Sequence, residues 1–66
     1  MTEINPKHID KFKNFLISRE ELEGDLKDEL LDLKRLDKIK MFLTNKIGLE
    51  SSYIHDLMAD FQEKIS

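Results

Sequence analysis

Four carboxylates in the middle of the chain have the spacing that would gather them on one face of a helix. They are Asp25, Asp28, Glu29 and Asp32. Residues three and four apart are neighbours on a helix surface, and these positions are separated by just those intervals. Carboxylates on a single helix can hold Mg²⁺ or Ca²⁺ only if another segment completes the oxygen shell, and the sequence has no calcium-loop pattern. We therefore expect no metal site and interpret the group as a docking surface for a partner protein with a basic surface.

Other residues capable of chemistry are few and scattered. The chain has no cysteine, and its two histidines, His8 and His55, have no ligand pattern beside them. A zinc site needs three or four convergent ligands, and two isolated glycines, Gly24 and Gly48, cannot build a phosphate-binding loop. The sequence therefore predicts no catalytic residue, no cofactor and no enzymatic activity.

Composition narrows the class of protein further. The 66 residues are 39% hydrophobic and 38% charged, with a net charge of −3. This length allows one small domain, 1–66, and the mixture is too apolar for a disordered tail. Charged residues interrupt every stretch that could cross a bilayer, and the first residues lack the basic-then-apolar layout of a signal peptide. We expect a cytoplasmic protein without membrane contact.

Charge is unevenly distributed along the sequence. Seven acidic residues and one lysine, Lys27, lie between Glu20 and Asp32. Basic residues flank this segment on both sides: Lys7, Lys11, Lys13, Lys34, Arg35, Lys38, Lys40 and Lys46. Such charges are typical of solvated helix surfaces.

Hydrophobic periodicity predicts an all-α chain with helices at about 6–23, 25–47 and 51–65. Asn5 and Pro6 form a start signal, because asparagine caps exposed amides and proline in the first turn loses no hydrogen bond. Gly48 can close the second helix in a left-handed conformation. The segment around Gly24 leaves two architectures open. A stop there gives a small three-helix bundle, whereas a continuous first and second helix gives one long helix plus a C-terminal helical hairpin.

The middle helix carries two hydrophobic stripes in succession. The first stripe contains Leu26, Leu30 and Leu33. The second contains Leu36, Ile39, Leu43 and Ile47 and lies about a quarter turn away, and the acidic face is predicted to continue the face of this second stripe. The last helix matches the stretch 36–47 in length, so we expect these two to form an antiparallel pair that leaves the acidic half open. A small core hides little apolar surface, and we therefore expect a homodimer.

Residues 41–58 resemble the helix-turn-helix pattern of DNA-binding proteins. Apolar residues and Gly48 fall where that motif places its packing positions and its turn. The resemblance implies a recognition helix beginning at Ser51, Ser52 and Tyr53 and including His55, with backbone contacts from Lys38, Lys40 and Lys46. Two departures weigh against it. Thr44 replaces the customary small alanine, and the recognition helix contains Asp56 and Asp60 but no arginine or lysine before Lys64.

Two functional hypotheses follow from these patterns. The first is a small intracellular helical module for protein–protein interaction, acting as a regulator or inhibitor through the acidic docking face. The alternative is a dimeric helix-turn-helix transcription regulator that binds DNA through residues 41–58.

Overall fold

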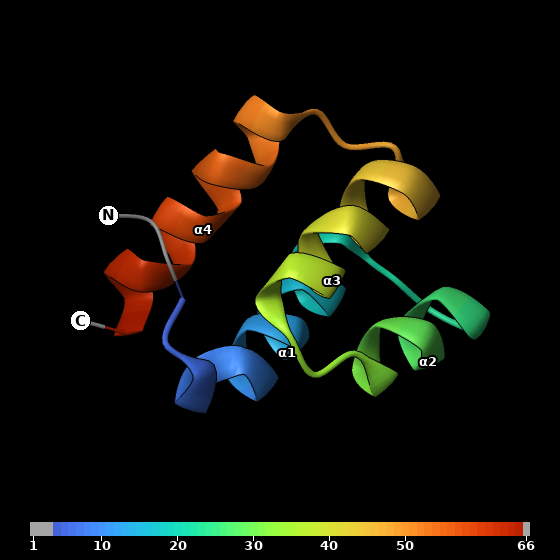
Figure 1. Cartoon of the computed structure of the whole chain (residues 1–66), viewed down its shortest axis with the longest axis horizontal. Helices are drawn as coiled ribbons and strands as arrows, with labels where there is room; N and C mark the ends of the chain where they lie inside the picture. Colours follow the sequence, from blue (N-terminus) through green and yellow to red (C-terminus); the bar gives the residue numbers. More distant parts are fainter. Residues whose placement is uncertain (1–3, 66) are drawn as a thin grey trace.

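The computed structural model describes residues 4–65, and every regular element in that range is helical (Figure 1). The elements in chain order are the 3₁₀ turn η1 (Pro6–His8), α1 (Ile9–Glu20), α2 (Asp25–Asp32), α3 (Leu36–Phe42), the π-helical turn η2 (Leu43–Ile47) and α4 (Ser51–Ile65). The all-α prediction is confirmed for this range. The expectation about a signal peptide depends on the first residues of the sequence. Of these, residues 1–3 lie outside the described range.

The first helical segment begins where the sequence predicts but ends earlier. The Lys7 amide donates to the Asn5 side-chain oxygen at 3.0 Å, and Pro6 opens the 3₁₀ turn before α1. The predicted end near residue 23 is wrong, because Glu21 adopts a left-handed conformation with φ 53°. The amides of Glu21 and Leu22 both donate to the Ile17 carbonyl, which closes the last turn of α1.

Gly24 separates α1 from α2. Its φ of 64° and ψ of −137° lie in a region that residues with a side chain rarely adopt. The alternative in which the first two helices are continuous is therefore wrong. With Glu21 also left-handed, the chain reverses between the two helices instead of extending the first one.

The predicted single helix over residues 25–47 is also wrong, because the chain breaks between α2 and α3. Leu33 and Arg35 are extended, with ψ of 139° and 143°. In a continuous helix the Leu31 carbonyl would accept from the Arg35 amide. Instead, the ammonium group of Lys13 on α1 donates to the carbonyls of Leu31 and Leu33 at 2.8 and 2.7 Å. The rotation of the hydrophobic stripe after Leu33 thus marks the start of a new helix.

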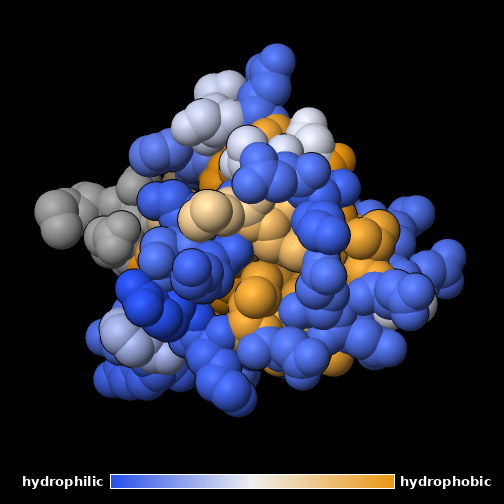
Figure 2. Space-filling model, turned by 45° about the vertical axis from the view of Figure 1, so that its right-hand side comes forward, coloured by the Kyte–Doolittle hydropathy of each residue, from blue (hydrophilic) through white to orange (hydrophobic). Residues whose placement is uncertain are grey.

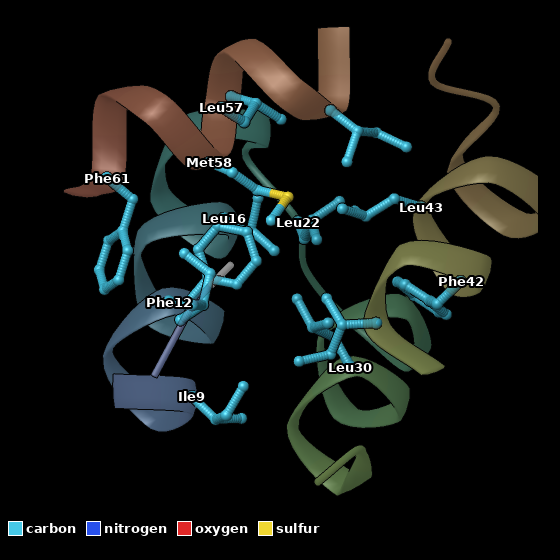
Figure 3. Packing of buried hydrophobic residues seen from close by; sticks show 13 residues of the cluster. Ile9, Phe12, Leu16, Leu22, Leu30, Phe42, Leu43, Leu57, Met58 and Phe61 are labelled. Carbon is cyan, nitrogen blue, oxygen red and sulfur yellow. The ribbon is translucent and has the colours of Figure 1, made fainter. Parts of the chain in front are cut away.

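One hydrophobic core connects the four α-helices of the described range. Figure 3 shows Leu16 of α1, Leu30 of α2 and Met58 of α4 directed into the space between the helices. The buried hydrophobic residues are Ile4, Ile9, Phe12, Leu16, Leu22, Leu30, Ile39, Phe42, Leu43, Ile54, Leu57, Met58 and Phe61. The core thus takes residues from every helix, but α2 contributes only Leu30.

Aromatic and polar contacts join α4 to α1. The Phe61 ring lies 5.2 Å from the Phe12 ring and 5.4 Å from the Phe15 ring, measured between centroids. Asp60 pairs with Arg19 at 3.2 Å. The sequence predicts that the last helix pairs with residues 36–47; these contacts show that α1 is a neighbour of α4, which the sequence does not predict. Within residues 4–65, no helix combines the length and the apolar character needed to cross a membrane.

Candidate functional site

The four predicted docking residues lie together on the outward side of α2. Among the eight residues of this helix only Leu30 is buried, and the carboxylates are all exposed. Successive residues rotate by about 100° around a helix axis, which places Asp25, Asp28, Glu29 and Asp32 in one sector opposite Leu30. We call these four residues the acidic face.

The acidic face is open for a different reason from the one that the sequence indicates. It does not continue the face of residues 36–47, because the extended residues Leu33 and Arg35 separate α2 from α3. The length of α4 therefore does not determine whether the acidic face is exposed. It is open because α2 meets the core through Leu30 alone, and its opposite side faces solvent.

Two exposed leucines flank the acidic face. Leu26 is 40% exposed and Leu31 is 38% exposed. Helical spacing predicts that Leu26 shares one hydrophobic stripe with Leu30 and Leu33, but Leu26 is exposed, and the exposure of Leu31 was not predicted. The adjacent pair Leu30 and Leu31 was the available signal, because neighbouring helix positions about 100° apart cannot both point into one core. Figure 2 is turned so that the side carrying α2 comes forward, and it shows hydrophobic surface between hydrophilic residues there.

One carboxylate of the acidic face has a basic neighbour. The Lys46 ammonium of η2 lies 3.9 Å from a Glu29 oxygen, and both side chains are largely exposed. An exposed pair of this kind contributes about 0–1 kcal/mol. Asp25, Asp28 and Asp32 have no ion-pair partner within residues 4–65. Most of the negative charge of α2 is therefore available to a partner.

Lys13 of α1 contacts the end of α2, and the sequence does not predict this contact. The residue is only 4% exposed, and its ammonium group lies 3.3 Å from an Asp10 oxygen in addition to the two carbonyls at the end of α2. A cation at a helix C-terminus is favoured by the helix dipole. The sequence predicts that Lys13 is one of several surface lysines. Lys13 is buried because the C-terminal end of α2 packs beside it.

The helix, turn and helix of residues 41–58 are present, with a left-handed Gly48 (φ 85°) between η2 and α4. Lys38 is exposed, Lys40 is half-buried, and Lys46 lies beside Glu29. These lysines are on α3 and η2. Ser51, Ser52, Tyr53 and His55 are exposed in the first turns of α4.

A carboxylate of α1 contacts the first turn of α4. The Tyr53 hydroxyl donates to a Glu20 carboxylate oxygen at 2.7 Å. This hydrogen bond and partial desolvation raise the pKa of Tyr53 above its ordinary value of 10.0. The buried residues of α4, such as Ile54 and Met58, place Ser52 and Asp56 on its outward side. That side presents no lysine or arginine before Lys64 and would meet a phosphate backbone with negative charge.

The two histidines belong to different elements, with His8 in η1 and His55 in α4. Among residues 4–65, no group of three or more histidine, aspartate or glutamate side chains is arranged to hold a metal ion.

Comparison with known proteins does not assign the chain to a family. No protein-family model matches it, and no curated protein or solved structure matches it significantly. The functional argument therefore depends on the chain's own surfaces.

Proposed function

We propose that this protein is a helical interaction module, regulatory or inhibitory in its effect, that binds a partner protein through the acidic face of α2. The observation that carries the proposal is that α2 has one buried side and one exposed, acidic side. One residue, Leu30, anchors the helix in the core, while four carboxylates and two flanking leucines are left at the surface.

The chemistry of this surface indicates the chemistry of the partner. A basic surface with an apolar patch would complement the carboxylates together with Leu26 and Leu31. Complementary charge acts mainly by raising the rate of encounter, and buried apolar contacts slow dissociation. Because Lys13 fixes the end of α2, the face is held in a defined orientation before a partner arrives.

Charge reversal on α2 tests this proposal. Wild-type protein and the Asp28→Lys/Asp32→Lys variant would be used to capture partners from native lysate, followed by mass spectrometry and measurement of association rates. A matched control, Glu50→Lys/Asp56→Lys, reverses two exposed carboxylates outside α2. We expect the α2 variant alone to lose the partner or to associate more slowly, with an effect that shrinks at high salt. A folded α2 variant that keeps every partner at unchanged association rates would contradict the proposal.

DNA binding remains the second candidate, and the left-handed turn at Gly48 between two helices supports it. The acidic outward side of α4 and the Glu29–Lys46 pair oppose it. A gel shift with duplex DNA at low salt distinguishes the two. A DNA-binding protein should retard the duplex at about 50 mM salt and lose affinity steeply as salt rises. It should also bind more weakly after substitution of Lys38, Lys40 or Lys46 by alanine.

A further inference from the structure

A groove of about 600 Å³ lies between the N-terminal segment and the start of α3. Its lining includes the apolar side chains of Ile4, Pro6, Ile9 and Leu36 and the basic side chains of Lys34 and Arg35. Ile4 and Ile9 belong to the core, so the groove has a fixed apolar floor next to a basic edge.

The basic edge carries net positive charge. Asp37 engages the Arg35 guanidinium through two contacts of 3.2 Å. Lys34 is exposed and has no ion-pair partner within residues 4–65. Lys38 is exposed on the first turns of α3, and Lys7 is exposed in η1 beside the groove residue Pro6. An occupant of complementary chemistry would present carboxylates together with apolar side chains.

The chain itself carries a surface with that chemistry. The acidic face of α2 combines carboxylates with the exposed Leu26 and Leu31. The acidic face is also adjacent to the groove, because Asp32 is the last residue of α2 and Lys34, which lines the groove, follows two residues later. Two complementary surfaces next to each other on one chain allow a two-fold arrangement in which each copy satisfies the other.

We propose that the occupant of the groove is a second copy of this chain, with the acidic face of each α2 seated against the basic groove of the other. This inference goes beyond the proposed function, because it concerns the pure protein and can hold whether or not another protein binds α2. The dimer would also cover the acidic face, so self-association and partner binding would compete.

Sedimentation velocity on the pure 66-residue chain tests the inference. We expect a dimer that dissociates as ionic strength rises from about 10 mM to about 1 M, because the Debye length falls from about 30 Å to about 3 Å across that range. Two charge-reversed variants separate the surfaces: Lys34→Glu/Lys38→Glu on the groove side and Asp28→Lys/Asp32→Lys on the α2 side. Each variant alone should dimerise at least about tenfold more weakly than the wild type, because like charges then face each other.

Mixing the two variants gives the decisive readout. The reversed groove of one variant complements the reversed α2 of the other, and the two native surfaces also match, so the mixture should recover the dimer. Asp56→Lys on α4 serves as the control and should dimerise like the wild type, with circular dichroism confirming that each variant is folded. A wild type that stays monomeric at every concentration, or a mixture that fails to recover the dimer, would overturn the inference. Loss of partner capture by the α2 variant alongside a monomeric wild type would uphold the proposed function and reject only the dimer.

Discussion

The ammonium nitrogen of Lys13 lies 2.7 Å from the carbonyl oxygen of Leu33, twenty residues further along the chain. A second hydrogen bond from the same nitrogen reaches the Leu31 carbonyl at 2.8 Å. Through these contacts a buried side chain of α1 supplies hydrogen bonds to two carbonyl groups at the end of α2, where the chain turns toward α3. The orientation of the acidic face therefore depends on a residue outside α2.

Replacement of Lys13 by methionine should destabilise the fold by about 2–3 kcal/mol, because two partly buried carbonyls lose a charged donor. The matched control is Lys11→Met, which changes an exposed lysine of the same helix and should stay within about 0.5 kcal/mol of the wild type. Urea denaturation followed by circular dichroism measures both. Equal midpoints for the two variants would show that the contacts with Leu31 and Leu33 contribute little.

Substitutions at the two glycines should separate two kinds of left-handed backbone. A Cβ at either position meets no atom within 4 Å, so any loss of stability must come from the backbone. Gly48 has φ 85° and ψ 27°, where asparagine is tolerated, whereas Gly24 has φ 64° and ψ −137°, a region close to one that only glycine occupies. We expect Gly24→Asn to cost about 1–3 kcal/mol and Gly48→Asn clearly less. Thermal melts of both variants provide the comparison, and a reversed order would contradict it.

Neighbouring leucines of α2 should respond very differently to truncation. Leu30 is fully buried, so Leu30→Ala should cost about 2–5 kcal/mol through lost burial and a residual cavity. Leu31 is 38% exposed, and Leu31→Ala should cost much less. Chemical denaturation of the two variants checks this difference. Similar losses at both positions would mean that α2 is rotated relative to the arrangement described above.

Tyr53 should titrate above pH 10, because the Glu20 carboxylate accepts a hydrogen bond from the neutral hydroxyl and raises the pKa. Since the folded-state pKa exceeds the unfolded value, the contribution to stability is complete below about pH 10 and is lost as pH rises through the folded pKa. Tyr53 is the single tyrosine of the chain, so the absorbance of tyrosinate reports on it alone.

The control for this titration is Glu20→Gln, which removes the carboxylate charge and keeps a hydrogen-bond acceptor. Its Tyr53 pKa should move back toward 10.0. An unchanged pKa in this variant would show that Glu20 is not the cause of the shift.

Local signals in the sequence predicted several features correctly. Asn5 and Pro6 mark the first helical turn, and Gly48 closes η2, because capping and positive φ depend on residue type and immediate neighbours. The gathering of Asp25, Asp28, Glu29 and Asp32 on one side of α2 was also predictable, since it follows from helix periodicity alone. The end of α1 at Glu21 was not, because a left-handed glutamate carries no signal of its own.

What the sequence by itself determined is therefore the helical class, the starts of the first and last helices and the composition of the acidic face. Each of these depends on residues within about one or two helical turns of one another. Only the tertiary structure decided that α2 stops at Asp32, that Lys13 is buried and that α4 contacts α1 through Phe61. The physical reason is common to all three. Each results from groups far apart in sequence competing for the same carbonyls or the same core volume, and local propensity cannot rank those alternatives.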